Sequence, residues 1–327
     1  MTRYYVAIDG GGTKTDMVFF DDAGRIIRRV VGPSSNPNAL SDGDLYSRFY
    51  DLFMGLWANE HPQELACCFA GMSGGDHPGL KKRLKRTIEE TISTRCDAII
   101  IENDAINALW SGTNGAPGIV VIAGTGSIAY GRVSGGDHFR IGGWGHLVGD
   151  DGSGYYIGRE AVRAALRMHD GLGTETKLAG AIKSHFDIPH LPDVIPIVYG
   201  SSKSVLASLV PVVDKAAQHG DTVAKTIMAN AARYLAELIQ AGIARFQQIQ
   251  VSETDTAVII VGGLWQSSLI RKKIAESVDH PLIFPDAPPV YGAMIGALQG
   301  NGDAFVKERL KQALQASAAG TPTENAE

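Results

Sequence analysis

Two segments of the chain repeat one pattern of apolar runs separated by glycine-rich turns. The first begins with the apolar run 4–8, which leads into Asp9-Gly-Gly-Gly-Thr-Lys-Thr15 and a second apolar run. The other is offset by 114 residues, with the apolar run 119–122 leading into Ala123-Gly-Thr-Gly-Ser127. In both segments a further turn and a third strand-like run follow. Because each copy opens one half of the chain, the repeat predicts a duplicated domain.

Segments with helical periodicity alternate with short apolar strands through the rest of the chain. The expected helices are 45–57, 79–91, 105–110, 158–169, 177–186, 204–218, 222–249 and 290–298. The expected strands outside the two repeats are 65–69, 98–101 and 257–261. Such alternation in two related halves predicts an α/β fold with mixed sheets. The tail from 302 carries one more amphipathic segment and ends in 320–327, which lacks large apolar residues and is expected to be disordered.

Charge and cysteine usage exclude several classes of function. The net charge is −5 and no long basic run occurs, which argues against nucleic-acid and anionic-membrane partners. No apolar run is long enough to span a bilayer, and no signal-peptide pattern is visible. Cys67, Cys68 and Cys96 have no metal-ligand spacing, and the adjacent pair fits a buried strand. We therefore expect a cytoplasmic protein that holds any phosphate ligand by local geometry.

The first glycine turn has the composition of an anion-binding site. Its candidate donors are Gly10, Gly11, Gly12, Thr13 and Lys14. Glycines lack a Cβ atom, so their backbone N–H groups can approach an anion closely and take positive φ angles. Asp9 at the strand end is a candidate Mg²⁺ ligand acting through water, because magnesium prefers oxygen ligands and keeps part of its hydration shell. An ordinary tight turn would show the same residues, and the turn alone does not decide between the two.

The second glycine turn also fits a nucleotide ligand. Its candidate phosphate donors are Gly124, Thr125, Gly126 and Ser127. With Ile128 and Ala129 they formally match the dinucleotide-binding pattern, but that pattern needs a helix directly after the glycines. The run 128–133 reads as a strand instead, which disfavours a dehydrogenase. Gly262 and Gly263 follow a buried strand and suit the flat face of a purine, although a tight strand-to-helix turn would look alike.

Five segments resemble one known family. The two glycine turns and Val261-Gly-Gly263 are similar, in this order, to the two phosphate motifs and the adenosine motif of actin-like ATPases. Gly142-Gly-Trp-Gly-His-Leu-Val-Gly-Asp-Asp-Gly-Ser-Gly-Tyr-Tyr156 resembles the signature of N-acetylglucosamine kinases in the BadF/BadG/BcrA/BcrD ATPase family. Ser34-Ser35-Asn36 and Gly71-Met-Ser-Gly-Gly-Asp76 are similar to sugar-side segments of that family. The resemblance spans about 4–298.

The resemblance implies an actin-like ATPase fold of duplicated RNase H-like domains, in two lobes with an interlobe active-site cleft. The lobes are expected at 1–116 and 117–289, with a helix at 290–301 that packs back on the N-terminal lobe and a tail at 302–327. ATP and Mg²⁺ are the implied cofactors, and a small-molecule sugar is the implied partner. A homodimer is compatible with the family but has no sequence feature of its own here.

The resemblance also assigns roles to residues. Asp104, which follows the strand 98–101, becomes the general base that accepts the proton of the attacking sugar hydroxyl. From the residues alone, the N-cap of the following helix is the favoured role for Asp104, and the two roles are compatible. The implied sugar contacts are Asn36, Ser73, Gly143, Trp144 and Asp150. Asp151 stays open as a residue that supports the phosphate or the metal, and His146 as a further ligand contact or a structural residue.

The activity implied is transfer of the ATP γ-phosphoryl group to the 6-hydroxyl of N-acetylglucosamine. Mammalian N-acetylglucosamine kinases carry Asn after the second glycine turn, where this chain has Ile128. That departure leaves N-acetylmuramate, glucosamine and a broad range of hexoses as alternative substrates. A nucleotide-dependent activator or sugar sensor on the same fold is the alternative from another class, but Cys67, Cys68 and Cys96 do not lie in glycine-framed cluster loops.

Overall fold

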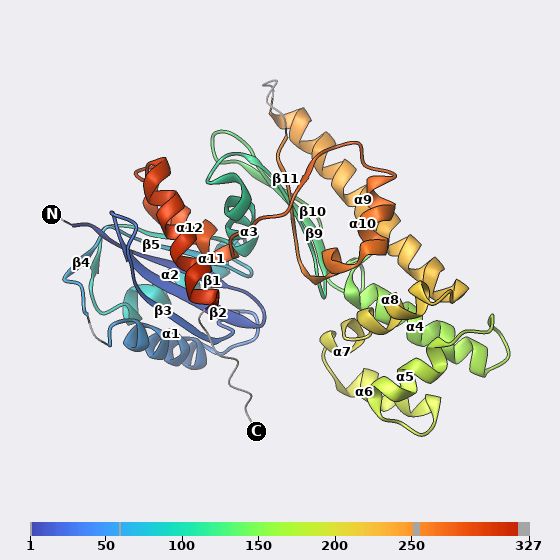
Figure 1. Cartoon of the computed structure of the whole chain (residues 1–327). Coiled ribbons are helices and arrows are strands. Elements are labelled where there is room, and N and C mark those ends of the chain that lie inside the picture. The colour runs from blue at the N-terminus through green and yellow to red at the C-terminus, as the bar shows by residue number, and fades with distance from the viewer. Residues whose placement is uncertain (1, 59, 251–255, 320–327) are drawn as a thin grey trace. The chain divides into compact units, whose positions relative to one another are not determined.

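A computed structural model describes residues 2–58, 60–250 and 256–319. The chain divides into two compact units (Figure 1). Unit 1 comprises Met1–Pro117 and Phe284–Glu327, and unit 2 comprises Gly118–Ile283. The segment from Phe284 onward, including the expected helix at 290–301, therefore belongs to unit 1. The expected disorder of 320–327 lies outside the described residues.

Unit 1 is built on a five-stranded sheet in the order β3-β2-β1-β5-β7. Its strands are β1 (Tyr4–Gly10), β2 (Lys14–Asp21), β3 (Ile26–Pro33), β5 (Cys67–Met72) and β7 (Ile99–Asn103). β1, β2 and β3 form an antiparallel meander, whereas β5 and β7 run parallel to β1. A small separate ladder joins β4 (Glu64–Leu65) to β6 (Arg95–Cys96).

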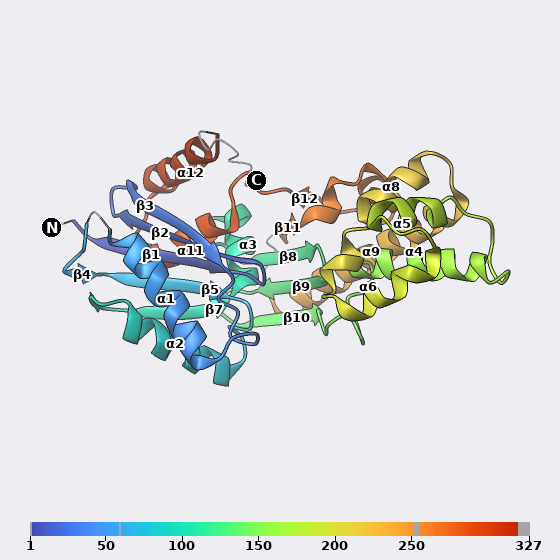
Figure 2. The same cartoon turned by 90° about the horizontal axis from the view of Figure 1, so that it is seen from below.

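Helices cover both faces of this sheet, as Figure 2 shows. α1 (Asp42–Leu56) and α2 (Pro78–Thr91) pack on the face that carries Val6, Ile8 and Phe19. α3 (Asp104–Thr113) and α11 (Pro289–Leu298) pack together and against β1 and β5 on the other face. Every residue of α11 from Val290 to Leu298 is buried, which explains why its sequence is apolar all round. α12 (Ala304–Ala319) follows it.

Unit 2 repeats the same sheet. Its order is β10-β9-β8-β11-β12, with β8 (Gly118–Ala123), β9 (Ser127–Arg132), β10 (His138–Gly142), β11 (Val258–Val261) and β12 (Leu282–Ile283). β8, β9 and β10 form an antiparallel meander, and β11 and β12 run parallel to β8. The two sheets thus share strand order and strand direction, as the sequence repeat predicts. The first glycine turn is one residue longer, since Gly10 pairs with Thr15 but Ala123 pairs with Ser127.

The helices of unit 2 differ from the sequence-based expectation in places. They are α4 (Gly154–His169), α5 (Leu178–Phe186), α6 (Val194–Gly200), α7 (Ser204–Ala207), α8 (Val210–Gln218), α9 (Thr222–Ile249) and α10 (Ser268–Ala275), with short 3₁₀ helices η1 (Leu191–Asp193) and η2 (Gly263–Gln266). The single helix expected at 204–218 is broken because Pro211 lies in the first turn of α8 and cannot continue a helix through it. No helix in the described ranges is long and apolar enough to cross a membrane.

Candidate active site

The predicted site residues of unit 1 gather at one edge of its sheet. β1, β5 and β7 are parallel, and their register sets Gly10 beside Met72 and Met72 beside Asn103. The segments that leave these three strand ends are the first glycine turn, the turn that begins at Ser73, and α3 with Asp104 at its first position. Carboxyl ends of parallel strands are the usual ligand-binding edge of an α/β sheet.

Two carbonyl groups of the first glycine turn accept hydrogen bonds from neighbouring segments of unit 1. Gly10 O accepts a 2.8 Å hydrogen bond from Ser73 N, and Gly11 O accepts one of 2.9 Å from Ser34 Oγ. A Cβ atom at Gly10 would overlap the end of the flexible Met72 side chain, which would have to move to make room. Gly10, Gly11 and Gly12 do not take positive φ, and a Cβ atom at Gly11 or Gly12 would meet no close neighbour, so neither backbone geometry nor packing requires those two glycines. Thr13 and Lys14 are exposed.

Asp9 is anchored by a buried amide that sequence reasoning did not single out. Asn107 Nδ2 on α3 donates to Asp9 Oδ1 at 2.7 Å. The same nitrogen lies 3.1 Å from Gly71 O and 3.3 Å from Ile8 O. Burial is the largest influence on Asp9 and raises its pKa to about 6, while the hydrogen bond from Asn107 opposes that rise. Asp9 therefore lies at the strand end with one carboxylate oxygen fixed.

Asp104 is not the N-cap of α3. The cap is Asn103, whose Oδ1 accepts a hydrogen bond from Ala105 N at 2.9 Å. Asp104 is the first helical residue, and its carboxyl accepts hydrogen bonds from the backbone N–H groups of Ala105 and of Asp104 itself. Burial, followed by the negative charge of Asp9, raises the pKa of Asp104 to about 7, and Asp76 adds to the rise. A carboxyl with a pKa near neutrality can take up a proton during a reaction.

The loop that carries Asn36 connects β3 to α1. Asn36 Oδ1 accepts a hydrogen bond from Asn38 N at 2.9 Å, an Asx turn. Asn36 N donates to Ser34 Oγ at 3.2 Å, and the same hydroxyl donates to Gly11 O. The structure therefore links Asn36 to the first glycine turn through one serine side chain.

In unit 2 the second glycine turn and the Gly262-Gly263 pair lie at the same sheet edge. β8 and β11 are parallel, and Ile122 pairs with Val261 directly before the two glycine segments. Gly262 has φ +114° and a Cβ atom there would overlap the Ala123 carbonyl, so this glycine is required by packing on β8. Gly263 faces open space.

The second glycine turn is also held by its carbonyl groups. Gly124 O accepts from Gly154 N at 2.7 Å, and Thr125 O accepts from Tyr155 N at 3.2 Å. These donors are the first amides of α4, which are orphaned in an isolated helix. Ser127 Oγ donates to Asp151 O at 2.8 Å, so this hydroxyl joins the turn to the segment 142–156.

The segment 142–156 presents Trp144 to solvent. The Trp144 side chain is 66% exposed, which excludes a core role for it. Arg140 Nη2 donates to the carbonyls of Gly143 at 2.6 Å and Gly142 at 3.3 Å, and the guanidinium carbon lies 4.2 Å from the Trp144 ring centroid. Glycine is needed at position 143 because a Cβ atom there would come within 2.7 Å of the Ile128 side chain.

Asp150 lies against the second glycine turn. It is buried with φ +58°, and its Oδ2 is 3.0 Å from where a Cβ atom of Gly126 would be. Asp151 is exposed. A pocket of about 300 Å³ opens beside them, and its lining includes Ser127, Gly143, Trp144, Asp150, Tyr234 and Glu237. Tyr234 and Glu237 come from α9 and carry no motif, so only the fold reveals them.

The sequence comparisons assign the family. The family model described as the BadF/BadG/BcrA/BcrD ATPase family matches residues 6–298. The chain belongs to the BadF/BadG/BcrA/BcrD ATPase family.

Two relatives extend this assignment. The N-acetylmuramic acid/N-acetylglucosamine kinase of Clostridium acetobutylicum is 38% identical over 239 residues, which are 71% of this chain and 77% of that protein. The N-acetyl-D-glucosamine kinase of Dictyostelium discoideum is 32% identical over 314 residues, 90% of this chain and 97% of that protein.

Solved structures agree on the fold. A candidate N-acetylglucosamine kinase from Chromobacterium violaceum matches with a TM-score of 0.70 at 23% identity, over 90% of this chain and 98% of that one. A ROK family glucokinase from Streptomyces griseus, in complex with glucose and AMPPNP, matches with a TM-score of 0.50 at 15% identity, over 96% and 99%. The expected actin-like α/β ATPase fold with two duplicated sheets is confirmed.

For a BadF/BadG/BcrA/BcrD ATPase the acidic residues of unit 1 fit one kind of metal ion. Within the described residues, no group of three or more His, Cys, Asp or Glu side chains forms a metal cage. Mg²⁺ in nucleotide sites does not need a cage, because it keeps several waters and takes one or two carboxylates together with phosphate oxygens. Asp9, with an anchored carboxylate next to the first glycine turn, meets that requirement.

Proposed function

We propose that this ATPase transfers the γ-phosphoryl group of ATP to the 6-hydroxyl of N-acetylglucosamine. The observation that carries the proposal is the position of Asp104 beside Asp9 at the sheet edge of unit 1, with a carboxyl pKa of about 7. Asp104 accepts the proton of the 6-hydroxyl as the oxygen attacks the phosphorus atom. Both named relatives are kinases whose names include N-acetylglucosamine, which supports this choice of acceptor.

The glycine turns hold the phosphates in this proposal. Backbone N–H groups of both turns, with Thr13, Lys14 and Thr125 at their flanks, donate to phosphate oxygens. The carbonyl contacts hold each turn in one conformation. The N–H groups of Gly11 and Gly124 donate within their own turns, to Lys14 O and Gly126 O, so the other donors of the turns meet the phosphates first. Gly262 and Gly263 flank the adenosine group. Asp9 holds Mg²⁺ through water, and the ion supplies charge neutralisation at the phosphates when it is bound.

The sugar contacts that we propose are polar and aromatic residues: Asn36, Ser73, Gly143, Trp144 and Asp150. An exposed tryptophan face suits the C–H surface of a sugar ring, and carboxylate and amide groups suit its hydroxyls. We expect the protein to act in the cytoplasm, where ATP is supplied.

N-acetylmuramate is the second acceptor to consider. Ile128 lies against Gly143 at the position where the resemblance places Asn in the mammalian enzymes, so no hydrogen-bonding side chain stands there. The relative from Clostridium acetobutylicum is named for N-acetylmuramic acid as well as N-acetylglucosamine. Tolerance of the larger sugar would follow from a wall that makes no hydrogen bond to the substrate.

A substrate panel with coupled ADP detection tests the proposal. N-acetylglucosamine, N-acetylmuramate, glucosamine and glucose are compared by kcat/KM, and the product is checked for a 6-phosphate. N-acetylglucosamine should give the highest value, or share it with N-acetylmuramate. Equal rates on glucose and N-acetylglucosamine refute the choice of acceptor, and absence of ADP release with every sugar refutes the kinase. Light scattering on the same preparations tests for a homodimer, which the proposal allows but does not need.

A further inference from the structure

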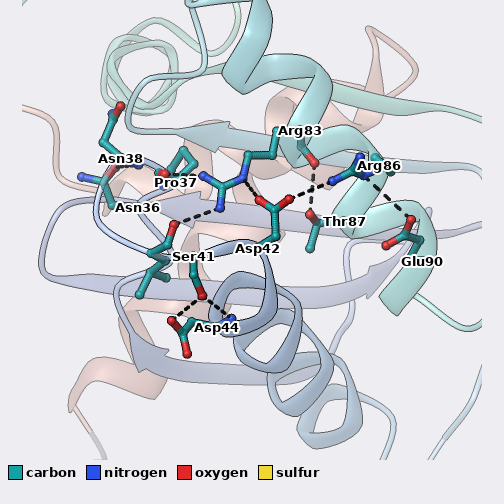
Figure 3. Close-up of polar contacts among 11 residues, drawn as sticks. Asn36, Pro37, Asn38, Ser41, Asp42, Asp44, Arg83, Arg86, Thr87 and Glu90 are labelled. Carbon is teal, nitrogen blue, oxygen red and sulfur yellow. Dashed lines mark hydrogen bonds and ion pairs between the residues drawn. The ribbon is translucent and has the colours of Figure 1, made fainter.

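One arginine of a neighbouring helix makes several hydrogen bonds to the loop that carries Asn36, as Figure 3 shows. Arg83 lies on α2 and donates through all three of its guanidinium nitrogens. Nη1 donates to Pro37 O at 2.5 Å, Nη2 donates to Leu40 O at 2.9 Å, and Nε pairs with Asp42 Oδ1 at 2.5 Å. The planar guanidinium group presents these donors in fixed directions, so a single side chain defines both ends of the 37–40 segment.

The rest of the loop has contacts that lead toward the site. Asn36 O accepts from Ala39 N at 3.1 Å, and Asn36 Oδ1 accepts from Asn38 N at 2.9 Å. Ser34 Oγ connects Asn36 N to Gly11 O. Asn36 is therefore fixed between the glycine turn on one side and the Arg83 contacts on the other. The amide nitrogen of its side chain is the group that remains to meet a ligand.

Arg86, one turn further along α2, shows that the Arg83 contacts are not generic surface ion pairs. It also pairs with Asp42, at 3.3 Å, and with Glu90, at 3.9 Å. Its side chain is 59% exposed, compared with 20% for Arg83, and its ion-pair partners are the carboxylates of Asp42 and Glu90. Exposed ion pairs of this kind contribute little to stability. Both arginines lie on α2 and pair with Asp42, but the hydrogen bonds to the loop carbonyls of Pro37 and Leu40 come from Arg83.

We propose that Arg83 is a positioning residue for the sugar, which holds the 36–40 loop in the conformation that presents Asn36 to the acceptor. The inference rests on the proposed function, because Asn36 is a sugar contact only there. Without Arg83 the loop has more conformations, and the sugar must select one of them when it binds. The loss therefore falls on sugar affinity and not on the chemical step.

The test compares Arg83→Met with Arg86→Met in the full chain. Methionine keeps an unbranched stem and removes the donors. Arg83→Met should raise KM for the sugar about tenfold, the size expected when charge-assisted hydrogen bonds that order a binding loop are lost. The kcat and the KM for ATP should stay near wild type, and calorimetry should give the same loss for sugar binding without ATP. Arg86→Met should match wild type in all of these. Arg83→Lys should recover part of the affinity.

Hydrogen exchange separates a failure of this inference from a failure of the proposed function. Amides of 36–40 should exchange faster in Arg83→Met than in Arg86→Met, with no substrate present. If wild type neither binds nor phosphorylates any sugar, the proposed function fails and this inference fails with it, whatever the exchange shows. Equal sugar KM in the two variants overturns the positioning role alone. So does a lower kcat at unchanged KM with a reduced Tm, which would mean that Arg83 only stabilises the fold.

Discussion

The side-chain amide of Asn107 donates a 2.7 Å hydrogen bond to Asp9 across 98 residues of sequence, from a position one helical turn after Asp104. One helix therefore carries both the proposed base and the group that orients the proposed metal ligand. Asn107 is fully buried, and its Oδ1 has no hydrogen-bond partner among the described residues. A buried acceptor without a partner costs about 1–3 kcal/mol. Stability alone therefore does not explain an amide at this position.

Replacing Asn107 should separate stability from activity. Asn107→Leu has nearly the same shape, removes the unpaired acceptor and leaves Asp9 without its anchor. We expect Tm to change little, because loss of the donor to Asp9, Gly71 O and Ile8 O offsets the gain from removing the unpaired acceptor. We expect kcat/KM to fall about tenfold or more, the size of a lost hydrogen bond to a charged group. Ser111→Ala, one turn later on α3, loses only a bond to the Ala108 carbonyl and serves as the control. Normal activity in Asn107→Leu would contradict this role.

The pH dependence of turnover should reflect the raised carboxyl pKa values. A base must be ionised to accept a proton, and burial together with Asp9 raises the pKa of Asp104 to about 7. kcat/KM should therefore be constant well above pH 7 and fall about tenfold per unit below it. The decline should steepen below pH 6, where Asp9 also takes up a proton. A profile that is flat from pH 5 to 8 contradicts the assignment.

The same shift predicts how stability depends on pH. Between 3.8 and about 7 the folded Asp104 holds a proton that the unfolded chain has released. Folding therefore takes up a proton in this window, and stability falls as the pH rises through it. Asp104→Asn removes that loss, so the variant should melt higher than wild type at pH 8 by about 2 °C or more. Near pH 4 the difference should shrink. An equal difference at both pH values would mean that Asp104 titrates normally.

Arg140 should matter for sugar binding through Trp144. Arg140→Met removes the donors to the carbonyls of Gly142 and Gly143 and the cation beneath the indole. We expect sugar KM to rise about five- to tenfold with little change in KM for ATP. The sugar-induced change in tryptophan fluorescence should shrink in parallel. Arg167→Met, whose side chain contacts the carbonyl of Leu172, is the control. If the sugar-induced fluorescence change and the sugar KM of Arg140→Met equal those of wild type, Arg140 has no role in sugar binding.

Sequence alone predicted the features that depend on patterns of consecutive residues. The glycine turns, the strands around them and the helix 222–249 depend on short patterns, and each is found where expected. The order of these patterns also predicted the duplicated sheets. The 114-residue offset places Thr13 on Ser127, but Thr15, two residues later, takes the place of Ser127 in the hairpin. Such a slip is invisible in a run of three glycines.

Other features depend on contacts between distant residues and left no local signal. Asn107 meets Asp9 through the packing of α3 on β1, and an asparagine inside a helical pattern gives no hint of that. The sequence predicted Asp104 as the N-cap of α3, but the cap is Asn103. Asp and Asn both suit an N-cap, so the residue types alone do not distinguish the two positions. α4 begins at Gly154, four residues before the expected start, since the carbonyls of the second glycine turn satisfy its first amides.

The most direct test of the account is the Asp104→Asn variant with N-acetylglucosamine and ATP. Sugar affinity, measured by calorimetry, should stay near wild type, because the amide keeps the shape of the carboxyl. Turnover should fall at least about 100-fold, because the proton of the 6-hydroxyl loses its acceptor. Asp97→Asn, an exposed aspartate of unit 1 paired with Arg95, controls for the change in charge. Near-normal turnover in Asp104→Asn would contradict the central claim.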